Sequence, residues 1–177
     1  IMIAIFGLVF TTQLQMALLP NMEYPAAVVI CYYNGASPSD MEELVTLCDH
    51  VIFNSFAQYV RHRKKVAARN AVSDTSHRVS IGLRINPEYS TQEGHAIYDP
   101  CAPASRLGTT LENFDESMLP LLDGLHFHTL CEQNADALER TVEAFLEKFG
   151  KYLPKIKWLN LGGGHHITRA GYDVERL

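Results

Sequence analysis

The sequence predicts an α/β fold built on a parallel sheet, and two observations lead to this prediction. Short apolar segments of strand length alternate with longer segments whose apolar residues recur at helical spacing, and parallel strands require such crossover helices. Polar residues and glycines also directly follow several of the predicted strands. The composition, 177 residues with 47% hydrophobic and 20% charged, is typical of a soluble globular domain.

The amino-terminal segment, residues 1–23, is atypical. Its first ten residues are continuously apolar, but polar side chains follow before the run reaches the roughly 18 residues that a membrane span needs. No lysine or arginine precedes Arg61, whereas a signal peptide begins with a positive region. We therefore expect neither a membrane anchor nor a signal peptide. The segment instead predicts a buried strand and a helical stretch from Gln13 to Leu19 that ends at Pro20.

The remaining residues, 24–177, show regular alternation of strands and helices. The predicted strands are Ala26–Tyr33, His50–Asn54, Val79–Asn86, Gly124–Thr129 and Lys157–Leu161. Ser37 and Pro38 are typical of an N-cap and a first helical position. Ser55 and Gln58 form a capping box for a second helix. A third helix should end near Gly150.

The apolar residues expected on the buried faces of these helices follow the helical period. They are Met41, Leu44, Val45 and Cys48 in the first helix, Phe56, Tyr59, Val60 and Ala67 in the second, and Leu138, Val142, Phe145, Leu146 and Phe149 in the third.

Both a doubly wound sheet and a (β/α)8 barrel fit this alternation. The barrel is favoured by the positions of polar residues, because the carboxyl ends of barrel strands share one mouth. Polar residues lie at or near those ends at Asn54, Arg84, Asn86, His126, His128 and in the segment from Gly162 to His166.

Charge and cysteine content exclude other classes. The net charge is −5, and the single basic cluster, Arg61 to Lys65, fits a solvated helix face better than a site for nucleic acid. The cysteines, at positions 31, 48, 101 and 131, lack metal-ligand spacing and form no CxxC pair. They indicate free thiols in a reducing compartment.

The stretch from Trp158 to Thr168 carries the first candidate site. A predicted strand leads directly into Gly162, Gly163 and Gly164, whose N–H groups can point into one concavity without obstruction by Cβ atoms. If a helix follows, its N-terminus would add further donors for a phosphate. An ordinary turn with no ligand is an equally good interpretation of this triplet alone.

His126 and His128 form the second candidate site. Side chains alternate along a strand, so both imidazoles should face the same side. They could bind a divalent metal together with His165 or His166 and an acidic residue. Alternatively, one imidazole could stack on a flat cofactor ring beside the glycine turn, or at least one of them could be an ordinary core residue.

Four segments together carry a family resemblance: Gly82–Ser90, Asp99–Gly108, Gly124–Glu132 and Asn160–Thr168. In the same order, they resemble carboxynorspermidine decarboxylase, a member of the alanine-racemase-like, fold-type III decarboxylases that use pyridoxal 5′-phosphate. The resemblance extends from about Cys31 to the end of the chain. It implies a (β/α)8 barrel that binds the cofactor and a cytoplasmic homodimer that decarboxylates carboxynorspermidine or carboxyspermidine in polyamine biosynthesis.

The resemblance also implies roles for individual residues. His128 would stack on the pyridine ring, Cys131 would lie near the phosphate, Gly162, Gly163 and Gly164 would donate N–H groups to it, and Arg84 would line the same pocket. Arg106, Glu132 and His166 would face the carboxylated polyamine. Arg106 could bind its carboxylate, although a structural ion pair is an equally good expectation. No metal site is implied.

The chain departs from this family in two respects. The family's Schiff-base lysine lies near the end of the first barrel strand, and residues 1–60 contain no lysine. The last barrel strands and the C-terminal β-domain are also missing, so the resemblance implies an incomplete barrel. We therefore expect a fragment or degenerate copy that is inactive alone. A catalytically silent homologue and a metal-dependent barrel hydrolase remain as alternatives.

Overall fold

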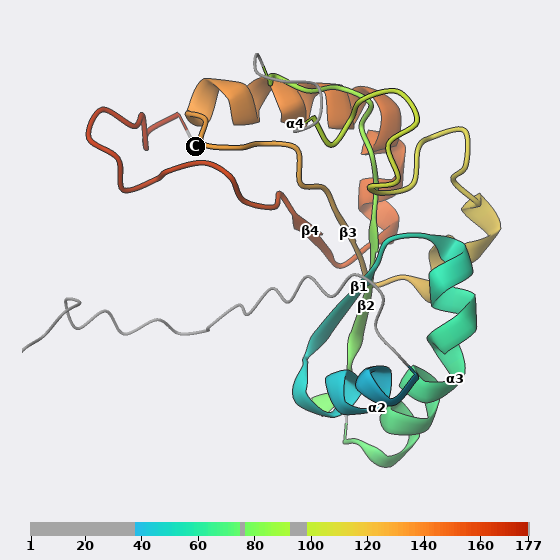
Figure 1. The fold of residues 1–177 in the computed structure, drawn as a ribbon. Coiled ribbons are helices and arrows are strands. Elements are labelled where there is room, and N and C mark those ends of the chain that lie inside the picture. Colours follow the sequence, from blue (N-terminus) through green and yellow to red (C-terminus); the bar gives the residue numbers. More distant parts are fainter. Residues whose placement is uncertain (1–37, 75–76, 93–98, 177) are drawn as a thin grey trace, which may run out of the picture. The chain divides into compact units, whose positions relative to one another are not determined.

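The computed structural model describes residues 38–74, 77–92 and 99–176 (Figure 1). The chain divides into two units, Ile1–Gly35 and Ala36–Leu177, and every described residue belongs to the second. The expectations for the apolar segment 1–23, the strand at residues 26–33 and the N-cap at residue 37 lie outside the described residues.

A parallel sheet organises the described part of the chain. Its strands are β1 (His50–Phe53), β2 (Ser80–Arg84), β3 (Gly124–His126) and β4 (Trp158–Asn160), and they lie in the order β1-β2-β3-β4. Each neighbouring pair is parallel, which confirms the predicted α/β class. All four strands end before the predicted boundaries, β1 by one residue, and beyond the ends only isolated bridges form, such as Ile85 with Thr109.

Three α-helices are described: α2 (Pro38–Leu47), α3 (Phe56–Val72) and α4 (Ala135–Phe149), with short 3₁₀ helices at Glu116–Leu121 and Gly150–Lys155. The predicted capping box is confirmed, because Ser55 Oγ accepts a hydrogen bond from the Gln58 N–H over 3.2 Å. The Gln58 side chain in turn accepts the N–H of Asn54 over 2.7 Å. The predicted end of α4 at Gly150 is also confirmed.

The buried face of α3 differs from the prediction. Tyr59, His62 and Val66 are buried, whereas Val60 is 45% exposed and Ala67 is exposed. The reason is Phe53 of β1, whose ring contacts the rings of Tyr59 and His62. His62 therefore lies in the core, although the sequence placed it in a solvated basic cluster.

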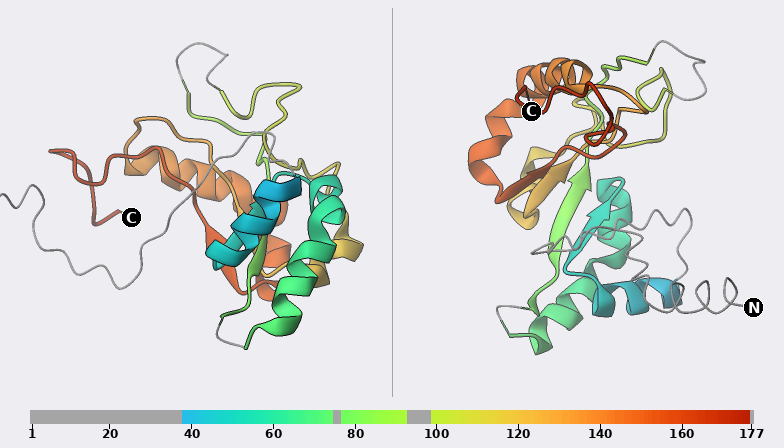
Figure 2. Two further views of the ribbon diagram at one scale, coloured as in Figure 1. Left: turned by 60° about the horizontal axis from the view of Figure 1, so that its bottom comes forward. Right: turned by 90° about the vertical axis from the view of Figure 1, so that its left-hand side faces the viewer.

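The helices pack against one face of the sheet. Phe53, Leu83, Leu125 and Leu159 are aligned across the four strands, and the first three are buried. Two apolar clusters cover this face. One contains Met41 and Val45 of α2 with Tyr59 and Val66 of α3, and the other contains Leu138, Phe145 and Phe149 of α4. Figure 2 shows α2 and α3 together beside β1 and β2, and α4 beside the later strands.

On the opposite face of the sheet lie Trp158 and, one row closer to the carboxyl ends of the strands, the polar row of Arg84, His126 and Asn160. Gly82, Gly124 and Trp158 are aligned across β2, β3 and β4. The indole lies directly over both glycines, since an added Cβ would be 2.4 Å from it at Gly82 and 2.1 Å from it at Gly124. Trp158 Nε1 also donates a hydrogen bond to Ser80 Oγ over 2.8 Å. This packing fills the middle of the face and leaves the next row for polar groups.

Within the described ranges, no helix is both long enough and apolar enough to cross a membrane.

Candidate functional site at the carboxyl ends of the strands

Arg84, His126 and Asn160 form the last row of the sheet. They are the terminal residues of β2, β3 and β4, and the strand register aligns them. His126 is only 2% exposed, and its Nδ1 lies 3.1 Å from Asn160 Oδ1. Burial lowers the pKa of His126 to about 4, against the hydrogen bond that Asn160 Oδ1 accepts from it, which raises the pKa. His126 is therefore neutral near pH 7.

His128 lies just beyond β3, with its ring centroid 6.3 Å from that of His126. Its side chain is partly buried, and its carbonyl accepts a hydrogen bond from Arg84 Nη2 over 3.1 Å. Burial and then the charge of Arg84 lower the pKa of His128. The strand end thus brings together one guanidinium and two imidazoles, as the alternation of side chains predicted.

The glycine turn after β4 needs its glycines. Gly162 and Gly164 have φ values of 75° and 85°, in the region that side chains disfavour. An added Cβ would lie 2.3 Å from the Phe127 carbonyl oxygen at Gly162 and 1.9 Å from that of Leu130 at Gly164. The turn therefore packs closely against the segment that follows β3.

Two N–H groups of the turn already have partners. Gly162 donates to Asn160 Oδ1 over 2.8 Å, and Gly163 donates to His128 Nδ1 over 3.3 Å. The helix that could have added donors after the turn does not form among the described residues, because 165–176 contain only turns, bends, irregular backbone and one bridge residue, His165. No helix dipole therefore supports the turn in this part of the chain.

The remaining predicted site residues lie at different distances from this centre. The Cys131 backbone reaches the turn, since a Cβ at Gly164 would lie 3.1 Å from its nitrogen. Arg106, Glu132 and His166 are exposed. Among described residues, no hydrogen bond or ion pair joins their side chains to the centre. This also means that the structural ion pair considered for Arg106 is not found within the described ranges.

Asn54 is a site residue whose role the sequence analysis missed. At the carboxyl end of β1, its Nδ2 donates to the Arg106 carbonyl over 2.8 Å and its Oδ1 accepts the Gly108 N–H over 2.9 Å. This two-sided amide contact holds the loop of residues 106–108 beside the strand ends. Its position at the carboxyl end of a predicted strand was the available signal.

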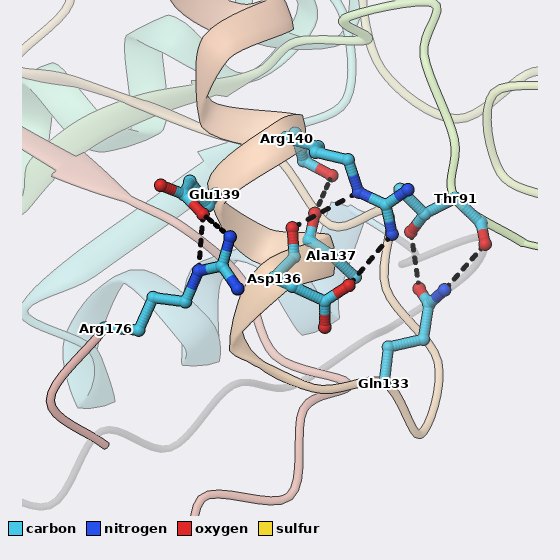
Figure 3. Close-up of polar contacts among 8 residues, drawn as sticks. Thr91, Gln133, Asp136, Ala137, Glu139, Arg140 and Arg176 are labelled. Carbon is cyan, nitrogen blue, oxygen red and sulfur yellow. Dashed lines mark hydrogen bonds and ion pairs between the residues drawn. The ribbon is translucent and has the colours of Figure 1, made fainter. Parts of the chain in front are cut away.

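Gln133 is a second missed residue. Its N–H donates to the Gly164 carbonyl over 3.0 Å, and its side chain exchanges hydrogen bonds with the Thr91 hydroxyl and carbonyl (Figure 3). It therefore ties the glycine turn to the segment after β2. Figure 3 also shows ion pairs on the α4 surface, between Arg140 and Asp136 and between Arg176 and Glu139.

The arrangement suits a flat phosphorylated ligand better than a metal ion. The described residues contain no group of three or more histidine, cysteine or acidic side chains placed to hold a metal, and His165 Nδ1 is 2.7 Å from the Tyr172 hydroxyl. An added Cβ at Gly163 would be in ordinary contact with His128, 3.7 Å from its Cε1. A glycine turn beside an imidazole and a guanidinium is a combination that can bind a phosphate group and a flat ring.

Comparisons with known proteins find similar chains, although no protein-family model matches this one. The chain is 41% identical over 155 residues to a carboxynorspermidine/carboxyspermidine decarboxylase of Campylobacter jejuni, covering 88% of this chain and 38% of that protein. It is 40% identical over 138 residues to a carboxyaminopropylagmatine decarboxylase of Synechocystis sp., covering 78% of this chain and 33% of the relative.

A solved structure gives the same result. The crystal structure of Campylobacter jejuni carboxynorspermidine decarboxylase complexed with norspermidine superposes with a TM-score of 0.63 at 39% identity, over 80% of this chain and 33% of that one. The sequence resemblance is therefore confirmed. The chain spans about a third of the length of the curated relatives it matches.

Proposed function

We propose, from the chain's similarity to part of carboxynorspermidine decarboxylase, that it forms part of the cofactor site of such an enzyme. The reaction removes carbon dioxide from carboxynorspermidine or carboxyspermidine and yields the corresponding triamine. The observation that carries the proposal is the meeting of Arg84, His128 and the glycine turn at the carboxyl ends of three neighbouring strands. A cytoplasmic location and a homodimer are part of the same proposal and rest on the family resemblance.

We propose that the described strands and helices are part of a (β/α)8 barrel. The strands follow one another across the sheet in chain order, and the residues of α2, α3 and α4 pack on the same face. Right-handed crossovers between strands in sequential order place every helix on one side, as in a barrel, whereas a doubly wound sheet has helices on both faces. The row of Arg84, His126 and Asn160 would then face the barrel interior.

The residues present have distinct roles toward the cofactor. Gly164 would offer its N–H group to the phosphate, while Gly162 and Gly163, whose N–H groups are donated to Asn160 and His128, would shape the turn. His128 would contact the pyridine ring, and Arg84 holds the His128 backbone through its carbonyl. Cys131 would lie near the phosphate. Pyridoxal 5′-phosphate, when bound, supplies an electron sink for the carbanion left by loss of carbon dioxide.

For the substrate we propose contacts from the exposed residues around this centre. Arg106 presents a planar guanidinium suited to a carboxylate, and Asn54 fixes the backbone beside it. Glu132 and His166 would face the polyamine part, for which the carboxylate of Glu132 has complementary charge. The relative solved with norspermidine supports a polyamine ligand for this site.

A catalytically silent homologue is the second candidate, and the lysines of the chain favour it. Four of the six make ion pairs away from the site, Lys65, Lys148, Lys151 and Lys157, and Lys64 and Lys155 are exposed on helices. None lies at a strand carboxyl end, so this chain brings no covalent anchor for the cofactor into the site.

Pyridoxine 5′-phosphate tests the proposed site, because it has the ring and the phosphate but no aldehyde and needs no lysine. We expect saturable binding by isothermal titration calorimetry, weakened about tenfold in His128→Ala by loss of ring contact. His77→Ala, at an exposed turn where His77 pairs with Asp74, is the control. Absence of binding, or equal binding in both variants, would overturn the proposed cofactor site.

An assay with the carboxylated substrate separates the two candidates. Carboxynorspermidine and pyridoxal 5′-phosphate are incubated with the chain, and norspermidine is measured by chromatography. Product would establish the decarboxylase, whereas cofactor-analogue binding without product would favour the silent homologue.

A further inference from the structure

The side-chain oxygen of Asn160 joins two parts of the site. Gly162 donates its N–H to Oδ1 over 2.8 Å, and His126 Nδ1 lies 3.1 Å from the same atom. A backbone N–H only donates, so the shared atom is the amide oxygen and not the amide nitrogen. That oxygen carries no hydrogen. In this pair the proton must therefore lie on His126 Nδ1.

A neutral imidazole carries one proton, so Nδ1–H leaves Nε2 of His126 unprotonated. His126 is buried with a pKa of about 4, and the neutral ring is the form present near pH 7. The charged and titratable groups that act on it are Arg84 of β2 and His128. Both disfavour a second positive charge, and Asn160 decides which nitrogen holds the proton.

His128 has the opposite arrangement. Gly163 donates its N–H to His128 Nδ1 over 3.3 Å, so this nitrogen holds a lone pair and the neutral ring carries its proton on Nε2. The two histidines of one strand end are thus held in opposite tautomers. The Asn160 side chain at the end of β4 selects the tautomer of His126. The glycine turn after β4, which Asn160 braces, selects the tautomer of His128.

We propose that Asn160 is a positioning residue of this site, which fixes His126 in the Nδ1–H tautomer and holds the glycine turn in the shape that a phosphate group requires. The phosphate part rests on the proposed function, whereas the tautomer part does not. Without the amide oxygen, Gly162 loses its acceptor and His126 loses the partner that selects its tautomer. The turn is then free to move away from His128.

Nitrogen-15 NMR of the histidine side chains tests the tautomers directly, with signals assigned through His126→Gln and His128→Gln. Asn160→Asp keeps an oxygen for both donors, and Asn160→Leu has similar volume but no acceptor. Asn113→Leu is the matched control, because Asn113 donates to Thr110 Oγ1 at an exposed turn outside the site.

We expect Nδ1–H at His126 and Nε2–H at His128 in the wild type and in Asn113→Leu. Asn160→Leu should convert His126 mainly to Nε2–H. Asn160→Asp should retain Nδ1–H and raise the pKa of His126, because a carboxylate replaces a neutral amide beside it. Asn160→Leu should also weaken pyridoxine 5′-phosphate binding about tenfold, with no change in Asn113→Leu.

Two results would overturn the inference. One is an unchanged Nδ1–H signal at His126 in a folded Asn160→Leu variant. The other is an unchanged His126 pKa in Asn160→Asp, which decides the matter even if Asn160→Leu does not fold. Failure of the wild type to bind pyridoxine 5′-phosphate would count against the proposed function and leaves the tautomer result to stand by itself.

Discussion

Gly124→Ala tests how closely the Trp158 indole packs on the sheet beside the polar row of Arg84, His126 and Asn160. An added Cβ would lie 2.1 to 2.3 Å from three atoms of the Trp158 indole, so the ring would have to move by more than ~1 Å to reach ordinary contact distance. The indole cannot move freely, because its Nε1–H donates to Ser80 Oγ and its ring meets the edge of His50 at a centroid distance of 5.4 Å.

The expected cost follows from these contacts. Overpacking of this kind costs about 1–3 kcal/mol, and loss of the Trp158 hydrogen bond adds about 1 kcal/mol. Replacing a glycine within a strand recovers about 0.5–1 kcal/mol of backbone entropy. We therefore expect Gly124→Ala to lower the free energy of unfolding by about 1–3 kcal/mol.

Urea denaturation followed by far-UV circular dichroism measures this change. Gly150→Ala is the control, since its Cβ would lie 3.7 Å from Leu146, an ordinary contact, and should change stability by less than about 0.5 kcal/mol. In the double variant Gly124→Ala/Trp158→Leu the clash is absent, so the two losses should fall short of additivity by at least ~1 kcal/mol. Equal stability of Gly124→Ala and Gly150→Ala, or an additive double variant, would refute the reasoning.

Four further outcomes are expected. Burial holds the pKa of His126 near 4 in the folded chain, below its value of about 6.5 in the unfolded chain. Between these two pH values the unfolded state binds more protons, so the free energy of unfolding falls by up to about 3 kcal/mol as the pH drops from about 6.5 to about 4. His126→Gln should reduce this pH dependence of unfolding. Treatment with pyridoxal 5′-phosphate and borohydride should label no single lysine stoichiometrically by mass spectrometry, since none lies at a strand carboxyl end; one uniquely labelled lysine would contradict this. Elemental analysis should find no stoichiometric transition metal, whereas about one zinc per chain, lost in His128→Ala, would favour the hydrolase alternative. Asn54→Ala removes both side-chain hydrogen bonds to the loop of residues 106–108. Hydrogen exchange of the Gly108 amide should therefore accelerate about tenfold or more. An unchanged exchange rate would show that other contacts hold the loop.

The local signals in the sequence were reliable where neighbouring residues complete the structure. The capping box of Ser55 and Gln58 requires residues that are three positions apart, and it forms as predicted. The end of α4 at Gly150 is similarly local. The glycine turn was also visible, because glycines directly after a strand indicate a close approach of the backbone.

Predictions that depended on distant partners were less successful. The face that α3 buries is chosen by Phe53 on a neighbouring strand, which draws in His62 and leaves Val60 outside. The expected helix after the glycine turn does not form among the described residues. There the chain instead makes contacts with distant residues, including a bridge between Gln133 and His165.

The sequence by itself determined the α/β class, most of the strands and helices and the family resemblance, because hydrophobic period, caps and glycines act within a few residues and because motifs in a fixed order indicate a family. Only the tertiary structure decided which side chains meet. Strand register aligns Arg84, His126 and Asn160, although His126 follows Arg84 by 42 residues and Asn160 follows His126 by 34, and no local pattern specifies that register. The tautomers of the two histidines follow from those contacts, since a neutral imidazole takes its proton where a neighbouring acceptor lies.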